Sequence, residues 1–378
     1  MLVTLAKEAE EQAEKEEAQS SQKKDLKEAI AISETLYANL EGAGFTKDWS
    51  YWKNRIFEFW TGQHRHISFE MIVQNGLIKF LVVTPHYLSE YTEQQIEAIY
   101  PTAQVEKVPD YNIFGSHSCI VGTYLKLTQN TVLPIRTYKN LDTDPLDGIT
   151  NTLSKVLPDE GVAVQILIRP AQPKWRQKAW KITKKMHHGK SFYEAANTTN
   201  NWIYVAFSLP IKAIEFILKE IFSANSTKKE DQAKKPEDEK KAQNEEEIIK
   251  LIEANNAKTW FETNIRVIVS TGNKIRSNEL LRNLINSFSQ FKEQRISNGF
   301  ASSFLIYKGG LFDDFIYRNF SEGHKVVLSS EELSSIYHFP LSSSETPNIA
   351  WLTTRKAAPP MNLPETGTIL GRTLFRGV

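Results

Sequence analysis

The sequence predicts an α+β fold with two ferredoxin-like (split βαβ) sandwich units, and three observations support this prediction. Apolar runs at residues 67–73 and 77–83 flank Asn75-Gly76, the dipeptide that best accepts the positive φ angles of a type I′ hairpin turn. From residue 77 onward, strand and helix patterns follow the order of a split βαβ unit, with the strand at 67–73 added at the sheet edge. A shorter set of the same patterns returns after residue 260.

The first predicted unit covers residues 49–170. A helix is expected from about Tyr87, and a strand follows over residues 119–127. Asp144 stands directly before a proline and is expected to cap a second helix. An alternating apolar strand over residues 162–168 completes the unit.

The second predicted unit covers residues 260–340 and is less complete. A strand is expected over residues 265–269, followed by a helix that Ser277 caps. Another strand is expected near Val326. Residues 329–332 then have the pattern of a capping box, which predicts the start of a short helix.

The two ends of the chain differ in character. Residues 1–48 are expected to form a charged tether, which has no apolar stripe, and then an amphipathic helix over 24–40. Residues 341–378 are expected to be an extended arm, because their prolines remove backbone donors and disfavour helix. Six aromatic residues before the first strand are expected to pack across the sheet or to form a partner interface: Trp49, Tyr51, Trp52, Phe57, Phe59 and Trp60.

A long insertion, residues 171–259, is expected between the two units. Its first part is basic and aromatic, and an apolar stripe after Pro210 predicts a helix. Its third part, residues 225–247, is a Lys/Glu/Asp/Gln run that is expected to be a disordered linker. The most apolar stretch, residues 202–222, contains two lysines and a glutamate, so we do not expect it to span a membrane.

Composition limits the classes of partner. The chain has 378 residues, with 46 basic and 45 acidic side chains and a net charge of +1. No overall field therefore attracts nucleic acid or anionic lipid, and such a partner needs a local patch. Cys119 is the only cysteine, which excludes an internal disulfide and a cysteine-rich metal site.

The local patch is the segment 174–190, which has seven basic residues, two tryptophans and no acidic residue. Cations neutralise phosphates and indoles stack on bases, so the segment suits a nucleic-acid contact. It also suits an anionic membrane surface, with the tryptophans at headgroup level. The third interpretation is a solvated amphipathic helix whose tryptophans pack on their own domain. The candidate contact residues are Lys174, Trp175, Arg176, Lys178, Trp180, Lys181, Lys184, Lys185 and Lys190.

No catalytic, cofactor or metal site is predicted, and we do not expect an enzyme. Gly189-Lys190-Ser191 matches the end of a P-loop, but Lys184 stands where the loop requires glycine. His64 and His66 have no third ligand nearby in the sequence. No Ser/His/Asp or Cys/His arrangement can be assembled from the sequence.

Four motifs in the last fifty residues carry a resemblance to a known family: EELSSIYHFP, TPNIAWL, RKAAPP and LGRTLFRG. They resemble the segment that precedes the P-loop core in bacterial conjugation and type IV secretion ATPases of the FtsK/HerA superfamily. The resemblance extends from about Lys24 to the end of the chain. None of the motifs is catalytic, so the resemblance implies an accessory or docking region of a motor that translocates DNA or protein.

The same resemblance implies the partners and the location. The expected partners are a C-terminal ATPase domain outside this chain, other secretion-system subunits, further copies in a hexamer, DNA, and the membrane surface. The location implied is the cytoplasmic face of the cell membrane. The alternative is an independent nucleic-acid-binding protein that uses residues 174–190. A GxxxxGK[ST] sequence encoded soon after Val378 would favour the motor.

Overall fold

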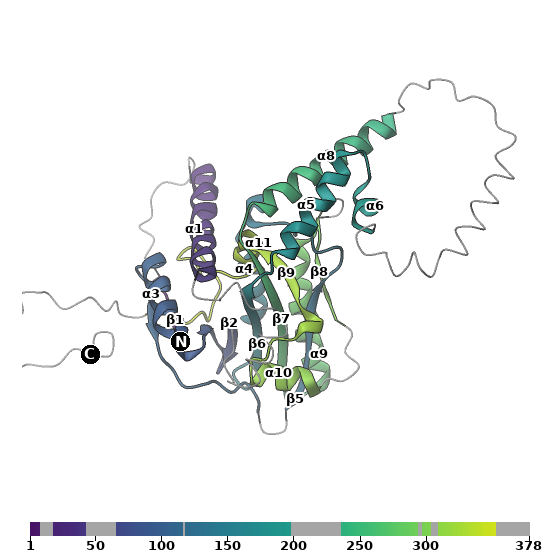
Figure 1. The fold of residues 1–378 in the computed structure, drawn as a ribbon. Coiled ribbons are helices and arrows are strands. Elements are labelled where there is room, and N and C mark those ends of the chain that lie inside the picture. The colour runs from purple at the N-terminus through teal and green to yellow at the C-terminus, as the bar shows by residue number, and fades with distance from the viewer. Residues whose placement is uncertain are drawn as a thin grey trace, which may run out of the picture.

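The computed structural model describes residues 1–7, 18–42, 66–115, 118–197, 236–293, 297–303 and 309–352. Within these residues, nine strands form one antiparallel sheet, and helices lie on both of its faces and beyond one end (Figure 1). The strands are β1 (Leu2–Thr4), β2 (Ile67–Gln74), β3 (Leu77–Val83), β4 (Gln104–Glu106), β5 (Cys119–Leu127), β6 (Gly161–Pro170), β7 (Trp260–Thr271), β8 (Phe300–Ser302) and β9 (Val326–Ser329).

The sheet order is β4-β1-β3-β2-β6-β7-β5-β8, and β9 also pairs with β7. The mixed architecture of helices and antiparallel strands confirms the coarse fold class. The helices are α1 (Ala18–Glu41), α3 (Ser89–Ile99), α4 (Pro145–Leu153), α5 (Lys174–His187), α6 (Phe192–Asn197), α8 (Pro236–Asn256), α9 (Lys274–Ser287), α10 (Gly309–Ile316) and α11 (Ser330–Ile336).

The main apolar core lies on one face of the sheet. Strand residues such as Phe69, Val164 and Val267 are buried there against α1, α4, α9 and α11. The opposite face has a smaller apolar cluster around Ile72 and Ile268, which packs against α10. The helices α5, α6 and α8 lie beyond the end of the sheet, where α5 and α8 contact each other (Figure 1).

The two ferredoxin-like units are not confirmed, because the strand order differs from the expected one. The strand at 67–74 was expected at an edge, but it is β2 and lies between β3 and β6. β6 pairs with β7 over ten positions, from Gly161↔Ser270 to Pro170↔Phe261. The strands of both expected units therefore belong to one sheet. All residues of β7 are buried, as expected of a strand that is paired along both edges and covered on both faces.

The N-terminal residues form a strand that the sequence did not predict. β1 lies between β3 and β4, and the amino group of Met1 donates to the Val82 carbonyl at 2.8 Å. Its short apolar run has no periodicity to detect, so this strand depends on its neighbours. α1 begins at Ala18, so the last part of the expected tether is helical, while residues 8–17 lie outside the described residues.

Part of the expected disordered linker is also helical, because α8 begins at Pro236. Ile249 and Ile252 of α8 are buried against α5 and α6. Their packing stabilises the Glu- and Lys-rich turns that precede them, since these residues have good helix propensity. Residues 225–235, the expected helix after Pro210 and the apolar stretch at 202–222 lie outside the described residues.

The local signals at turns and helix starts are largely correct. Asn75 and Gly76 have φ angles of 55° and 73°, as a type I′ turn requires. The Asp144 side chain accepts from the Leu146 backbone N–H at 2.8 Å and caps α4. The capping box that begins α11 is present.

The predicted cap of α9 is wrong. Asn273 caps this helix, because its side chain accepts from the Ile275 N–H at 2.8 Å. Ser277 lies one turn further along, is buried, and donates to the Cys119 carbonyl at 2.8 Å. Serine is a common capping residue, but here its hydroxyl forms a hydrogen bond that connects α9 to β5.

The first part of the predicted arm lies along the sheet. The Ile78 N–H donates to the Asn348 carbonyl at 2.8 Å, and the Ala350 N–H donates to the Ile78 carbonyl at 2.9 Å. Residues 353–378, the aromatic group at 49–60 and His64 lie outside the described residues. Among the helices that the structure describes, none has an apolar stretch long enough to cross a bilayer.

Candidate functional site

The basic segment forms α5, and its apolar residues face the protein. Ala179, Ile182 and Met186 recur at helical spacing and are buried against α6 and α8. Trp260, at the start of β7, belongs to the same cluster and joins these helices to the sheet. The apolar face of α5 is therefore already covered.

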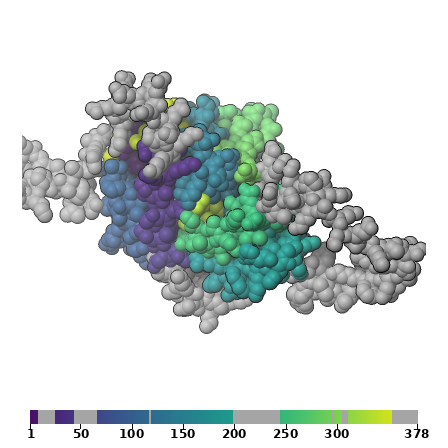
Figure 2. Space-filling view, turned by 90° about the horizontal axis from the view of Figure 1, so that it is seen from above, coloured from purple at the N-terminus to yellow at the C-terminus, as the bar shows by residue number. Residues whose placement is uncertain are grey.

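The opposite side of α5 is open to solvent, and Figure 2 shows α5 in teal beside α8 in green at this end of the molecule. We call its exposed cations and Trp180 the basic face. The structure divides the predicted contact residues into two groups. Trp175, Lys178 and Lys185 are half-buried. The exposed residues are Lys174, Arg176, Trp180, Lys181, Lys184 and Lys190.

The two tryptophans, which the sequence could not distinguish, have different environments. The Trp175 Nε1–H donates to Glu262 Oε1 at 3.0 Å, and Glu262 is buried on β7. Trp180 is 57% exposed, and Lys184 Nζ lies 5.0 Å from the centroid of its ring. Trp175 therefore anchors α5 to the sheet, while Trp180 is available to a ligand.

Two polar side chains near the basic face already bind other parts of the protein. His187 Nε2 lies 2.9 Å from Glu253 Oε1 of α8, and Arg176 donates to the Lys258 carbonyl at 2.9 Å. Within the described part of the chain, no carboxylate forms an ion pair with Lys181 or Lys184. Lys181 directly follows Trp180, and Lys184 lies about one helical turn further along α5. The three side chains therefore form a compact cationic and aromatic surface.

The Gly-Lys-Ser triplet ends a helix rather than forming a phosphate loop. Gly189 has a φ of 81°, and its N–H donates to the Met186 carbonyl at 2.8 Å. The Lys190 N–H then donates to the Lys185 carbonyl at 3.2 Å, which is the pattern of a glycine C-cap. A backbone that is used to close a helix does not wrap a phosphate.

Of the two histidines at positions 64 and 66, the structure describes only the second. His66 is buried, and its Nε2 lies 2.6 Å from the Arg318 carbonyl. Across the described ranges, no group of three or more His, Cys, Asp or Glu side chains could hold a metal ion.

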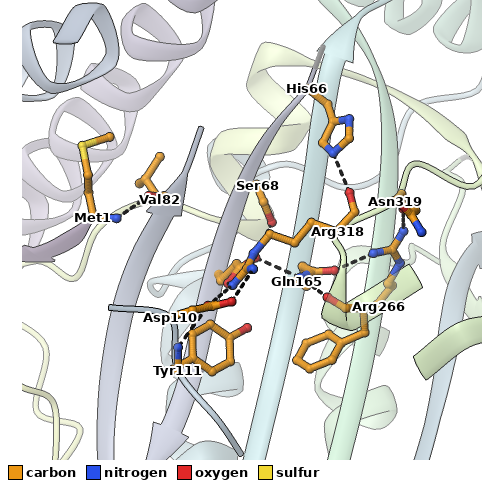
Figure 3. A network of polar contacts seen from close by, with 12 residues as sticks. Met1, His66, Ser68, Val82, Asp110, Tyr111, Gln165, Arg266, Arg318 and Asn319 are labelled. Carbon is orange, nitrogen blue, oxygen red and sulfur yellow. Dashed lines mark hydrogen bonds and ion pairs between the residues drawn. The ribbon is translucent and has the colours of Figure 1, made fainter. Parts of the chain in front are cut away.

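A second polar feature, on the sheet itself, was not predicted. Glu70 of β2, Gln165 of β6, Arg266 of β7 and Tyr124 of β5 lie in register across four neighbouring strands. We call these four residues the polar row, and Figure 3 labels two of them, Gln165 and Arg266. Gln165 donates to Glu70 at 2.9 Å, and Arg266 donates to Gln165 at 2.6 Å.

The polar row is buried, and burying polar groups destabilises the folded state unless they are hydrogen-bonded. Glu70, Gln165 and Arg266 are all 0% exposed. Burial raises the pKa of Tyr124 to about 12, so its hydroxyl stays protonated and donates to Asp314 at 2.6 Å. The sequence does contain a signal for this row in two of the strands, because Glu70 and Gln165 each interrupt an apolar run near its middle.

The comparison with known proteins identifies a family. Residues 50–352 match the family described as Domain of unknown function (DUF8128). The chain belongs to this family. The matched region contains both the basic face and the polar row, so both features lie within the family's domain. No curated protein matches the chain.

Proposed function

We propose that this chain is a non-catalytic accessory region of a translocation motor, and that its basic face contacts the phosphate backbone of nucleic acid. The observation that carries the nucleic-acid contact is the exposed surface of Lys181, Lys184 and Trp180, which has no ion-pair partner among the described residues. Lysines neutralise phosphates, and an exposed indole provides a surface on which a base stacks.

The burial of the opposite side of α5 favours nucleic acid over lipid. A helix that lies in a membrane interface buries its apolar face among the acyl chains. In α5 that face, which includes Ile182 and Met186, is already packed against the protein. Trp180 is the one large apolar side chain of α5 that is strongly exposed. A lipid contact would therefore have little apolar area to bury.

The nucleic-acid contact predicts salt-dependent binding. We expect a labelled single-stranded oligonucleotide to bind the full chain, with a log–log salt slope of about −3 to −4 for roughly four to six phosphate contacts. Replacing both Lys181→Glu and Lys184→Glu should weaken binding about 100-fold at low salt, because two attractive charges become repulsive. Fluorescence anisotropy across a salt titration measures both quantities.

The matched control reverses two lysines elsewhere on the surface. Lys155→Glu with Lys274→Glu changes the net charge equally, and both side chains are exposed on elements other than α5. This variant should keep most of the affinity. Absence of binding at low salt, or an equal loss in the control, would rule out the basic face as the contact.

The motor context rests on the resemblance of the last fifty residues and has a separate test. An in-frame GxxxxGK[ST] sequence soon after Val378 in the gene would support it. A gene with no ATPase motif in that reading frame would leave an independent nucleic-acid-binding protein, with the same basic face, as the better interpretation.

A further inference from the structure

The polar row holds the main chain of another part of the protein. We call residues 309–325, which comprise α10 and the segment after it, the strap. Arg266 Nη1 donates to the Asp314 carbonyl at 2.6 Å, and its Nη2 donates to the Asn319 carbonyl. Gln165 Nε2 donates to the Phe315 carbonyl at 3.3 Å. Two side chains of the sheet thus bind three carbonyl groups of the strap.

Residues beside the row extend the same kind of contact. Asn264 Nδ2 donates to the Ser321 carbonyl at 2.9 Å, and the Ser321 N–H donates back to Asn264 Oδ1 at 2.6 Å. His66 Nε2 lies within hydrogen-bond distance of the Arg318 carbonyl. The sheet therefore recognises the strap over residues 314–321 largely through backbone groups, as a protein recognises a bound peptide.

Three strap side chains add chemical specificity, and Figure 3 shows one of them, Arg318, beside Asp110. Asp314 accepts from Tyr124, and Phe315 is 4% exposed and packs edge-on against Phe114 at 5.9 Å. Arg318 donates to Glu70 at 2.9 Å and to Asp110 at 2.7 Å. The recognised pattern is thus an acid, an aromatic residue and an arginine in the spacing Asp-Phe-x-x-Arg.

The strap is attached by these polar contacts and by a small apolar cluster that includes Leu311 and Phe315, whereas the other face of the sheet is held by a much larger apolar core. Ile316 and Tyr317, at the end of α10, are 46% and 66% exposed. Arg318 has a φ of 53°, a left-handed conformation that is unfavourable for a non-glycine residue. Opening the strap would expose Leu311 and Phe315 but leave the larger core on the other face intact, and it would return the buried charges of Glu70 and Arg266 to water. Such a segment opens more easily than the core of a sheet.

One nitrogen of the polar row forms no hydrogen bond with the strap. Arg266 is fully buried, and its Nε has no hydrogen-bond partner in the described ranges. We propose that the polar row is a peptide-binding surface, that the strap occupies it in this structure, and that the strap releases without unfolding the sheet. In the open state the surface takes a peptide segment of another chain with the Asp-Phe-x-x-Arg pattern.

Hydrogen exchange on the full chain tests the release. We expect amides of residues 314–321 to exchange at least about 100-fold faster than those of β6 and β7, because local opening is cheaper than global unfolding. Arg318→Ala should accelerate strap exchange by about tenfold or more and leave β6 and β7 unchanged. Arg276→Ala is the matched control, since Arg276 lies on α9 and its ion pair is with Glu160, just before β6, and not with the strap. Equal exchange of strap and central strands in the wild-type chain would overturn the proposal.

Peptide binding in trans tests the recognition. A labelled peptide with the sequence of residues 309–325 should bind the full-length Arg318→Ala protein at least about tenfold more tightly than the wild-type protein, whose own strap competes at high effective concentration. The same peptide carrying Asp314→Ala and Arg318→Ala should lose about tenfold in affinity. If Arg318→Ala does not fold, Asp314→Ala provides the weakened strap. A folded variant with an open strap that fails to bind the peptide would refute the surface. Neither readout involves α5, so the result is independent of nucleic-acid binding.

Discussion

At position 338 a histidine is buried beside two aspartates. His338 Nε2 lies 3.1 Å from Asp144 Oδ1, and the contact is an ion pair whose geometry falls short of a hydrogen bond. His338 Nδ1 lies 2.8 Å from the Ser334 carbonyl. Burial alone disfavours the charged ring, but Asp144, the Ser334 carbonyl and Asp147 together raise the pKa of His338 above its ordinary value.

This histidine predicts a pH-dependent stability. A group whose pKa is raised by folding contributes stability that is complete below its unfolded pKa of about 6.5 and is lost as the pH rises through its folded pKa. We expect His338→Gln to lower the free energy of unfolding by about 3–5 kcal/mol near pH 5, because Asp144 is left buried without its charged partner. The difference from wild type should shrink as the pH rises through the raised pKa of the folded state.

Urea unfolding at several pH values measures this effect. His188→Gln, at an exposed histidine just after α5, is the control and should give a difference near zero. A His338→Gln difference that stayed constant over the whole range would show that the histidine acts only through packing.

At the scale of one element, α11 depends on a single carboxylate. Glu332 is 3% exposed and accepts from the backbone N–H groups of Ser329 at 2.8 Å and Ile135 at 2.9 Å. Its side chain also accepts from Asn255 at 3.2 Å. The capping box predicted from local sequence is therefore also the point where α8 and the segment before α4 meet α11.

Two substitutions separate the local role from the tertiary one. Ser329→Ala should lower the free energy of unfolding by about 1 kcal/mol, because it removes one cap bond. Glu332→Ala should cost about 3 kcal/mol or more, since two buried backbone donors and Asn255 lose their acceptor. Chemical denaturation measures both, with the exposed Glu345→Ala as control. Equal losses for Ser329→Ala and Glu332→Ala would contradict the tertiary role.

At the scale of the whole molecule, the long β6–β7 pairing determines how the described parts unfold. Ile166 of β6 and Ile265 of β7 are paired and completely buried, although they belong to the two separate units expected from the sequence. Ile166→Ala and Ile265→Ala should each lower the free energy of unfolding by about 2–4 kcal/mol and shift one common transition.

Fluorescence and circular dichroism followed through the same urea titration test this prediction. Ile275→Ala changes a side chain that is 71% exposed and should leave the midpoint within error. Two resolved transitions, each moved by only one of the core substitutions, would show two independent units instead of one sheet.

The sequence by itself determined the features that depend on neighbouring residues. The Asn75-Gly76 turn, the Asp144 cap and the α11 capping box were predicted correctly, because a turn or a cap is formed within a few residues of chain. The tertiary structure decided which strands pair and which tryptophan of α5 is exposed. It also decided that part of the segment expected to be a disordered linker is helical, in α8. It also brought Glu70, Gln165, Arg266 and Tyr124 into one row. These features depend on contacts between residues far apart in the chain, and strand pairing is set by the burial of both sheet faces, which local patterns do not encode.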